Sequence, residues 1–437
     1  MKIIAKLLTL TALLACCLSC RSDRSSDQDK ITITFWHSFV SSTIPALNQL
    51  IAKFEAEHPR LTIKAQYVPT GDALIQKLIT AVQSKTAPDI SWIHADFLEN
   101  LVKANAIYDM DHFIKASNGL TSAEVEDIYP ALWQYAAWRG TIYSLPMEAT
   151  NLALLYNKDL FRAAGLDTAR PPQTWEELID YAAKLTVDKN KDGKFEQIGF
   201  FLPVYPAAGP LSGWMQWQWM PFLWQAGGEL INPEQSRVLY NSSAGMAALQ
   251  LWQRLYQAQQ LKTFTSDYDV AFASRRLAMA MDGPWNLPRF KELLKNINWA
   301  IAPLPAGPSQ QVTIVGGEYL AIFRQSLHPN ESWEFLKWII RPDVQAMWSI
   351  KSGYLPVRHA VKAIPEFQQY LTDHPNFKVF VDQMEHGQAQ KPIDYYGLQI
   401  SRHIAEAIEK ATLGQLEVRQ ALDEAAQKSD ALLSSVK

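Results

Sequence analysis

After residue 30, strand-like and helix-like segments alternate along the chain, and this alternation limits the folds that it can adopt. Residues 31–35 alternate apolar and polar side chains as a strand does, and two further strand-like runs cover 61–68 and 89–93. Apolar residues at helical spacing occupy 44–58 and 73–84, between these runs. Strands that alternate with helices predict an α/β layer built on a mostly parallel sheet.

Aromatic and polar residues follow the ends of these three strands. Ligands of open α/β sheets gather at the carboxyl ends of the strands. We therefore expect ligand-facing side chains there, and the candidates are Trp36, His37, Ser38, Asp72 and Asp96.

The remainder of the chain continues this mixture of patterns. Strands are predicted at 277–281, 299–302 and 319–323, and helices at 174–185, 244–259, 332–340 and 401–433, the last with a break near Gly414. A chain of about 400 residues is too long for one ordinary core, so two domains are expected.

A polar segment between two apolar runs is a candidate crossing between these domains. Pro146 ends the strand-like run 141–145, and a second apolar run covers 152–156. Glu148, Thr150 and Asn151 lie between them, where they can face a ligand. An ordinary loop on a single domain is the alternative.

The first 30 residues indicate export. Residues 1–15 combine two lysines with a short apolar run, which is typical of a signal peptide rather than a membrane span. Cys16 matches the lipidated cysteine of a bacterial lipobox, with Cys20 as the competing position and plain secretion as the alternative. Residues 16–30 lack apolar side chains after the cysteines and are predicted to form a flexible tether. The prediction is an extracytoplasmic protein that a lipid anchor holds at a membrane.

Charge and motif content exclude several classes of function. Removal of residues 1–15 leaves 39 basic and 44 acidic residues, a net charge of −5, which disfavours a nucleic-acid partner. The chain has no phosphate-binding glycine loop, zinc-protease pair or nucleophile elbow, and no cysteine after residue 20. We therefore predict neither an enzyme nor a cofactor. A glycosidase carboxylate pair drawn from Asp96, Glu148, Asp282 and Glu318 is the weaker alternative.

Residues 188–196 resemble the front half of a calcium-binding loop. Asp188, Asn190 and Asp192 place oxygen atoms at alternate positions, and Gly193 follows at the turn. Gly199 stands where the last glutamate ligand is expected, so a tight polar turn is the favoured interpretation and no metal is predicted.

Tryptophans are concentrated at 213–224, a segment that contains four of the 15 in the chain. Indole rings complement the apolar C–H faces of sugars, and Trp217 and Trp219 are the candidates for this role. Packing in the core is the alternative for each of them.

Several motifs, in order along almost the whole mature chain, resemble family 1 of the solute-binding proteins of ABC importers, which includes maltose- and sn-glycerol-3-phosphate-binding proteins. The matching segments are Phe35-Trp-His-Ser38, Ala87-Pro-Asp-Ile90, Leu154-Leu-Tyr-Asn-Lys-Asp-Leu-Phe161 with Ala164-Gly165, Pro171-Pro-Gln-Thr-Trp-Glu-Glu-Leu178, Ala278-Met-Ala-Met-Asp-Gly-Pro-Trp285, Gly316-Gly317 and Gly353-Tyr-Leu-Pro-Val-Arg358.

The resemblance implies a type II-like periplasmic-binding fold, with two α/β lobes that close on a ligand about a hinge of several segments. It assigns 31–145 and 282–325 to an N-terminal lobe, and 146–281 and 326–437 to a C-terminal lobe. It also implies that the closed form docks on a membrane permease driven by a separate ATPase. The protein is expected to be a monomer, and a partnership with a signalling receptor is a further alternative.

The resemblance also suggests which residues contact the ligand. Asp96 matches a carboxylate that binds sugar hydroxyls, and Trp285 matches a stacking tryptophan. Thr150, Trp217, Gly316, Gly317 and Tyr354 fall at other contact positions of the family. The candidate site is completed by Trp36, His37, Ser38, Asp72, Glu148, Asn151, Trp219, Asp282, Glu318, Arg358, Tyr396 and Gln399.

One departure from the family pattern bears on the ligand. Glycerol-phosphate binders have an arginine-glycine-x-arginine run where this chain has Tyr396-Gly397-Leu398-Gln399. A phosphate dianion requires fixed positive charge, which Arg358 or Arg402 would have to supply. We therefore expect a neutral di- or oligosaccharide or a glycosylated polyol, with sn-glycerol 3-phosphate or its diester as the alternative.

Overall fold

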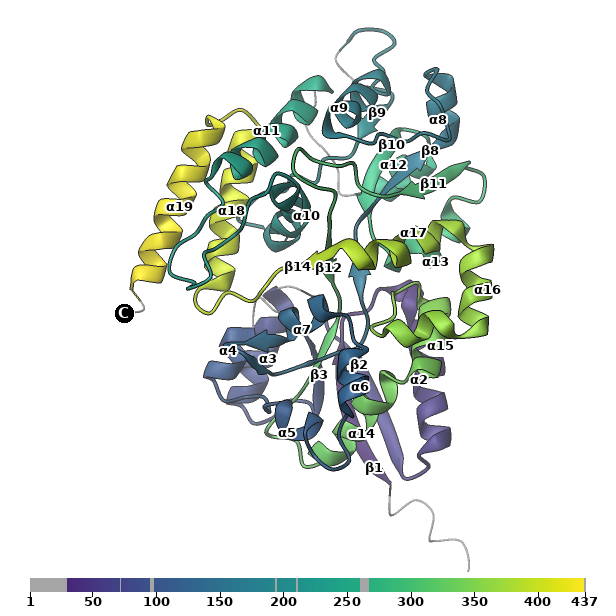
Figure 1. Ribbon diagram of the computed structural model, residues 1–437, viewed down its shortest axis with the longest axis vertical. Coiled ribbons are helices and arrows are strands. Elements are labelled where there is room, and N and C mark those ends of the chain that lie inside the picture. The colour runs from purple at the N-terminus through teal and green to yellow at the C-terminus, as the bar shows by residue number, and fades with distance from the viewer. Residues whose placement is uncertain are drawn as a thin grey trace, which may run out of the picture.

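The computed structural model describes residues 30–70, 72–94, 98–192, 195–209, 211–259 and 267–435. They form two lobes, each with its own sheet, joined by extended segments at the middle of the molecule (Figure 1). The α/β character expected from the alternating pattern is confirmed.

The first lobe is built on a five-stranded sheet. Its strand order is β2 (Leu61–Tyr67), β1 (Ile31–His37), β3 (Ile90–Ile93), β13 (Tyr319–Ile322) and β6 (Leu145–Pro146). Strand β1 is parallel to β2 and β3, whereas β13 is antiparallel to both of its neighbours. The sheet is therefore mixed: the β2–β1–β3 part is parallel, whereas β13 re-enters this lobe after the crossing strand at 313–316 and pairs antiparallel with β3 and β6.

The second lobe is built on a four-stranded sheet. Its order is β11 (Trp299–Ala302), β8 (Ala153–Asn157), β10 (Leu277–Asp282) and β9 (Ile198–Phe200). Only the β10–β9 pairing is parallel. The predicted assignment of 282–325 to the N-terminal lobe is wrong for β11, because Ile301 pairs with Leu155 of β8 in this second sheet.

A small third sheet lies between the lobes. It has the order β14 (Gly387–Ala389), β12 (Thr313–Gly316) and β7 (Thr150–Asn151). The backbone at Thr150 pairs with Gly316, so the segment predicted to cross between the domains is paired with a second crossing segment. The chain therefore passes between the lobes at three adjacent places (Figure 1).

Helices cover both faces of the first sheet. They are α2 (Ile44–Glu57), α3 (Asp72–Gln83), α4 (Leu98–Lys103), α5 (Asp111–Ile114), α6 (Ser122–Glu126), α7 (Pro130–Ala136), α14 (Pro329–Ile339) and α15 (Pro342–Ser352), with the 3-10 turn η1 (Ser41–Thr43) and the hairpin β4 (Ala137–Trp138)–β5 (Thr141–Ile142). The assignment of 326–437 to the C-terminal lobe is wrong for α14 and α15. Phe335 of α14 packs edge-on against Phe54 of α2, 4.8 Å between ring centroids, and α15 also packs on α2.

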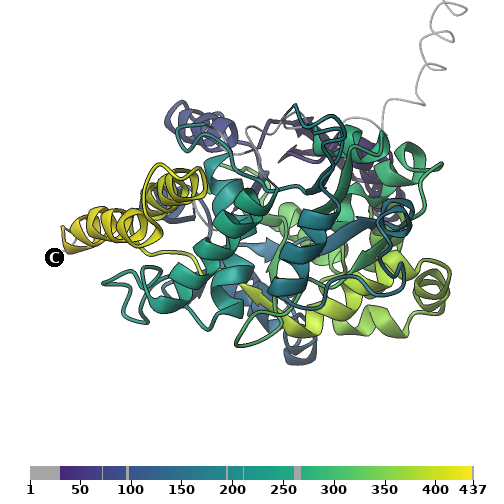
Figure 2. The same ribbon diagram turned by 90° about the horizontal axis from the view of Figure 1, so that it is seen from above.

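The second lobe carries the remaining helices. They are α8 (Lys158–Ala163), α9 (Trp175–Lys184), α10 (Ser212–Gln225), α11 (Ser243–Ala258), α12 (Tyr268–Ala273), α13 (Leu287–Leu293), α18 (Gly397–Thr412) and α19 (Val418–Ser434). The other elements are α16 (Pro365–Asp373) and α17 (Pro375–Gln383), with the 3-10 turns η3 (Pro284–Asn286), η4 (His359–Ala363) and η5 (Met384–His386). Turn η4 packs on α15 of the first lobe, and α17 packs on β11 of the second. Seen from above, α18 and α19 stand at one edge of the molecule (Figure 2).

Two local features follow directly from the sequence. Gly414 takes a φ of +70° between α18 and α19, which is the predicted break, and glycine adopts this conformation without a Cβ clash. Helix α10 is apolar on nearly every side and packs against α11, α18 and β12, so it is fixed from several directions. Within the described ranges no helix is both long and apolar enough to cross a bilayer.

Candidate functional site

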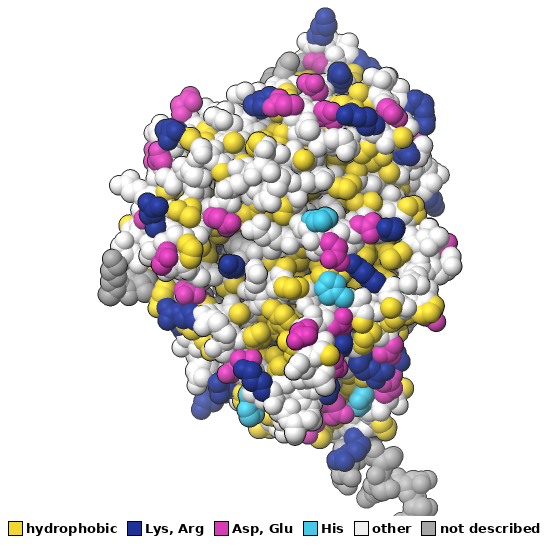
Figure 3. Space-filling model, in the orientation of Figure 1, with side chains coloured by type: hydrophobic (Ala, Val, Ile, Leu, Met, Phe, Trp, Pro, Cys, Tyr) yellow, Lys and Arg dark blue, Asp and Glu magenta, His cyan; other side chains and the backbone are white. Residues whose placement is uncertain are grey.

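A cavity of about 390 Å³ lies where the two lobes meet. Hydrophobic side chains are concentrated across this middle region on the face shown in Figure 3. The first lobe contributes Ser38, Val40, Thr70, Ile75, Trp92, His94 and Tyr135 to its wall. The crossing segments contribute Thr150, Gly316, Gly317, Glu318 and Tyr354. The second lobe contributes 211–214, 216–217, Trp285, 390–393, 397–398 and 401–402.

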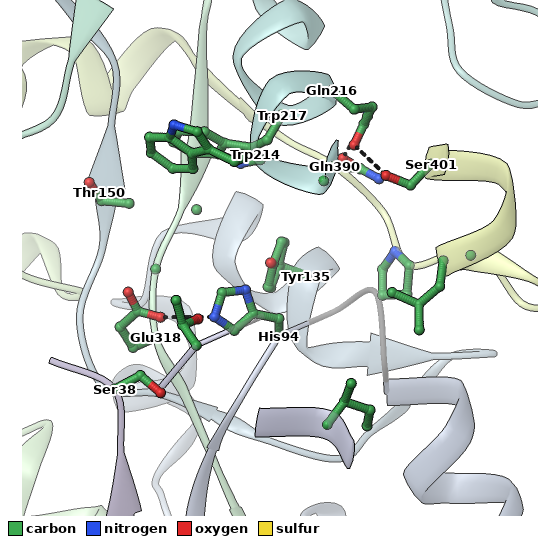
Figure 4. A pocket seen from close by; sticks show the side chains of 18 of the residues that line it. Ser38, His94, Tyr135, Thr150, Trp214, Gln216, Trp217, Glu318, Gln390 and Ser401 are labelled. Carbon is green, nitrogen blue, oxygen red and sulfur yellow. Dashed lines mark hydrogen bonds and ion pairs between the residues drawn. The ribbon is translucent and has the colours of Figure 1, made fainter. Parts of the chain in front are cut away.

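Three tryptophans form one wall of the cavity. Trp214 and Trp217 stand one turn apart on α10 and stack, with ring centroids 5.0 Å apart and 17° between planes (Figure 4). Trp285 meets Trp214 edge-on at 5.7 Å. Because Trp217 packs over Gly316, where a Cβ would lie 3.2 Å from its ring, this wall also contacts a crossing segment.

Buried polar atoms without partners point to a ligand. Among the described residues, Thr150 Oγ1 and Trp92 Nε1 have no hydrogen-bond partner, and both residues line the cavity. A buried polar atom left unpaired costs about 1–3 kcal/mol, so such atoms are typical of positions that a ligand satisfies.

A pair of buried carboxyl groups lies at the crossing. Glu318 lines the cavity beside His94, whose Nε2 is 3.8 Å from Glu318 Oε2 (Figure 4). Glu148 is fully buried, and its Oε2 accepts a 2.6 Å hydrogen bond from Trp348 Nε1. Burial, and then the charge of Glu318, raise the pKa of Glu148 well above its usual value, and burial does the same for the pKa of Glu318.

The opposite side of the cavity is polar and partly basic. Gln216 Nε2 donates to Gln390 Oε1 at 3.3 Å, and Ser401 Oγ donates to Gln216 Oε1 at 3.4 Å (Figure 4). Lys391 and Arg402 line the same region. The sequence predicts Arg402 only as a substitute ligand for a phosphate group.

The structure brings several predicted residues together at the cavity. They are Ser38, Thr150, Trp217, Trp285, Gly316, Gly317, Glu318 and Tyr354. Glu148 lies directly behind them, because a Cβ on Gly317 would come within 2.1 Å of the Glu148 carbonyl oxygen.

Other predicted residues have structural roles instead. Trp36 and His37 belong to β1 and face the core, where burial lowers the pKa of His37 to about 4. Asn151 is fully buried, and its Nδ2 donates to Phe380 O at 2.8 Å. Trp219 is fully buried in the second lobe, because it lies two residues beyond Trp217 on the opposite side of α10. None of these four residues lines the cavity.

Asp282 lies beneath the tryptophan wall rather than in the cavity. Its carboxylate accepts hydrogen bonds from Tyr268 Oη at 2.8 Å, Gly283 N at 2.7 Å and Asn286 Nδ2 at 3.0 Å. Burial raises the pKa of Asp282 to about 7. The carboxylate thereby holds the turn that carries Trp285.

Three C-terminal candidates are also directed away from the cavity. Arg358 is buried and pairs with Asp127 at 2.7 Å. Tyr396 precedes α18 in a left-handed conformation, with its hydroxyl 3.2 Å from Ser435 Oγ. Gln399 is exposed and does not line the cavity. The side chain of Asp72 and the whole of Asp96 lie outside the described residues.

Sequence reasoning missed several residues of the cavity wall. Tyr135, Gln216, Gln390 and Ser401 were not predicted, and Trp92, His94 and Trp214 were indicated only as members of the tryptophan set or of a strand end, although all seven line it. Helical spacing was an available signal, because residues three apart on a helix share a face and this places Trp214 beside Trp217.

An ion pair joins the first lobe to the segment 390–396, part of which lines the cavity. Arg139, at the turn of the β4–β5 hairpin, pairs with Asp394 at 3.4 Å and contacts the Tyr395 hydroxyl. The segment 390–396 is held to the second lobe by Gln235, which accepts a 2.6 Å hydrogen bond from Asp394 N. We call these contacts of Arg139 with Asp394 and Tyr395 the interlobe latch.

The calcium-like segment forms a local turn. Asn190 Oδ1 accepts a hydrogen bond from Asp192 N at 3.1 Å, and its amide donates to the Asp192 carboxylate at 3.2 Å. Gly193 lies outside the described residues, and the part of the chain that is described contains no group of three His, Cys, Asp or Glu side chains placed to hold a metal. The loop at Asp188 stays a weak candidate.

Comparison with known proteins agrees with this two-lobed architecture. The sn-glycerol-3-phosphate-binding periplasmic protein UgpB of Escherichia coli is 24% identical over 92% of each chain. The crystal structure of a cyclic alpha-maltosyl-1,6-maltose binding protein from Arthrobacter globiformis matches with a TM-score of 0.79, at 26% identity, over 93% of this chain and all of that one. An ABC transporter solute binding protein from Thermotoga lettingae, bound with alpha-D-tagatose, matches with a TM-score of 0.78, at 25% identity, over 92% of this chain and 99% of that one.

A family model supplies the assignment. It describes bacterial extracellular solute-binding proteins and matches residues 49–377, which is most of the chain and includes both lobes. The chain therefore belongs to the bacterial extracellular solute-binding protein family.

Proposed function

We propose that this protein captures a di- or oligosaccharide, or a glycosylated polyol, in the cavity between its lobes. It is the substrate-binding subunit of an ABC importer, as its family membership and its similarity to sugar- and glycerol-phosphate-binding relatives indicate. Members of this family bind solutes rather than transform them, and no catalytic step is proposed.

The tryptophan wall is the observation that carries the choice of a sugar. Trp214, Trp217 and Trp285 present indole surface to one cavity, which suits the apolar C–H faces of a pyranose ring. Thr150 Oγ1 and the Gln216–Gln390–Ser401 group offer hydrogen bonds to hydroxyls at its margins.

Glycerol 3-phosphate is the second candidate, and a specific observation favours it. Lys391 and Arg402 line the cavity where α18 begins, and a helix N-terminus and cations both attract phosphate. Against it, Arg358 is committed to Asp127, and Glu318 places a carboxyl group in the same cavity. A carboxylate there repels a phosphate dianion, so a ligand without phosphate is favoured.

The change in the thermal unfolding midpoint tests this choice. A ligand that binds only the folded protein stabilises it and so raises the midpoint. At a ligand concentration of a hundred times the dissociation constant, the free energy of unfolding rises by about 2.7 kcal/mol. We expect a rise with at least one of maltose, trehalose, sucrose and glucosylglycerol, and none with glycerol 3-phosphate. A rise with the phosphate ester alone would reverse the assignment.

Membrane attachment and transport partners form a finer part of the proposal. The protein acts outside the cytoplasm as a monomer, a lipid on Cys16 anchors it, and the ligand-bound form delivers the sugar to a permease with a separate ATPase. The lipobox pattern supports Cys16 over Cys20. Labelling with a radioactive fatty acid checks this, because Cys16→Ala loses the label whereas Cys20→Ala retains it.

A further inference from the structure

Two acidic side chains share one buried place at the crossing, where His94 is the basic residue that contacts Glu318. Glu318 is 9% exposed and Glu148 is fully buried. Met147 N donates to Glu318 O at 2.8 Å, which fixes the two backbone segments side by side. The absence of a Cβ at Gly317 allows this close approach.

Neither carboxyl group is fully satisfied by the described residues. Glu318 Oε2 and Glu148 Oε1 are buried and have no hydrogen-bond partner there. No lysine or arginine of the described ranges forms an ion pair with either residue. His94 contacts Glu318 and can supply at most one positive charge. One negative charge is therefore left over when both carboxyl groups are ionised.

Buried charge of this kind is costly unless it is paired. A neutral sugar offers hydroxyl donors but no charge, so the pair keeps the proton that its raised pKa values imply, whereas an ammonium group offers donors and pairs with the ionised form. Aromatic rings that attract cations stand around the same place, because Trp92 and Tyr354 line the cavity with Glu318.

We propose that Glu318, backed by Glu148, forms a subsite for a positively charged amino group, so that the captured carbohydrate is an amino sugar or another amine-bearing glycoside. The inference rests on the proposed function. It differs from the ligand expected from the sequence in charge, because that expectation was a neutral sugar and the one proposed here is positively charged. The tryptophan wall binds the sugar rings, and the carboxyl pair selects the amine.

Two matched series of disaccharides test this by titration calorimetry at pH 6.0 in 0.15 M salt, where the amino groups of these sugars are protonated. The first contains cellobiose, N,N′-diacetylchitobiose and fully deacetylated chitobiose, which carry hydroxyl, acetamido and ammonium groups at the same ring positions. The second contains trehalose and its 2-amino-2-deoxy analogue. In at least one series we expect the amine to bind about tenfold more tightly than the hydroxyl sugar, because hydrogen bonds to charged groups contribute more than neutral ones.

Glu318→Gln keeps the shape of the side chain and removes its charge. We expect this variant to lose the preference for the amine while it still binds the hydroxyl sugar. Glu334→Gln, on the exposed surface of α14, is the matched control and keeps the preference. Circular dichroism verifies that both variants fold.

The outcomes separate this inference from the proposed function. Tighter or equal binding of the uncharged sugars, or a preference for the amine that survives Glu318→Gln, overturns the amine subsite and leaves sugar capture intact. Failure of every sugar in both series, with binding of glycerol 3-phosphate, overturns the proposed function and this inference with it. Failure of all these compounds counts against both.

Discussion

The indole rings of Trp214 and Trp217 stack on one face of α10, with their centroids 5.0 Å apart. The pair is held from behind by a helix that is buried between α11, α18 and β12. Trp214 is 36% exposed, so the stack leaves aromatic surface accessible to a ligand. An open and rigid aromatic surface is what a sugar ring requires.

Replacement of Trp217 by alanine is expected to weaken sugar binding by about tenfold or more, because an aromatic contact contributes about 0.5–1.5 kcal/mol beyond the area that it buries. Calorimetry with the sugar that gives the largest rise in midpoint measures the effect. Tyr67→Ala is the control, because Tyr67 is 56% exposed and lies outside the cavity. Equal losses of sugar affinity in the two variants would show that the tryptophan wall does not bind the sugar.

The interlobe latch is expected to favour the closed arrangement. Arg139 pairs with Asp394 and also lies over the rings of Trp138 and Tyr395, at 4.8 and 4.5 Å from their centroids. Exposed ion pairs and cation–π contacts each contribute up to about 1 kcal/mol, so Arg139→Ala should reduce sugar affinity by about three- to tenfold. Small-angle scattering should show a larger radius of gyration for the sugar-free variant.

A matched control exists for the latch. Arg254 pairs with Glu176 within the second lobe, at 2.5 Å, with both side chains exposed. Arg254→Ala removes an arginine of similar exposure without touching the contact between lobes. An unchanged affinity and radius for Arg139→Ala, matching those of Arg254→Ala, would contradict a role for the latch in closure.

Gly317 is expected to tolerate no side chain. A Cβ there would lie 2.1 Å from the Glu148 carbonyl oxygen and 3.0 Å from Ala149 Cα, so two crossing segments would have to separate. Gly317→Ala should reduce the free energy of unfolding by about 3 kcal/mol and weaken ligand binding as well. Gly140→Ala, where nothing lies within 4 Å, should lower stability by about 1 kcal/mol through backbone strain and leave binding unchanged. Urea unfolding and calorimetry measure the two effects.

Asp282 gives a pH dependence with a definite sign. Its pKa is about 7 in the folded protein and near 3.8 in the unfolded chain, so between these values the folded protein holds a proton that the unfolded chain releases. The contribution of Asp282 to the free energy of unfolding is therefore present at low pH and is lost as the pH rises towards 7. The loss is at most about 1.4 kcal/mol per pH unit. Asp282→Asn lacks this component.

Urea unfolding of the wild type and Asp282→Asn at pH 5 and pH 8 measures it. The stability of the wild type relative to the variant should decrease between the two pH values. Comparison with the variant cancels the buried His37, whose pKa of about 4 acts in the opposite direction, because both proteins contain it. A constant difference between the two proteins would show that Asp282 does not titrate in this range.

Local patterns predicted the elements well, because they depend on neighbouring residues. The helix predicted at 44–58 is α2, and the break near Gly414 separates α18 from α19. The lobe boundaries were predicted less well. Strand β11 joins the second sheet through pairing with β8, and no local property of residues 299–302 specifies that partner.

The same division applies to the site. Ser38, Trp285 and Glu318 were selected from strand ends and motifs, and they do line the cavity. Trp217 and Trp219 carry the same side chain two residues apart, yet only Trp217 faces the cavity, because their directions depend on how α10 packs. Asp282 and Glu318 are both buried acids, and only the three-dimensional contacts show that Asp282 is held by Tyr268 and Asn286.

Binding of a sugar against the tryptophan wall between the lobes is decided by calorimetric titration of the wild type and of Trp217→Ala with the same sugar. We expect one binding site per molecule in the wild type and at least a tenfold weaker one in the variant. Equal affinities for the two proteins, or heat only with glycerol 3-phosphate, would contradict it.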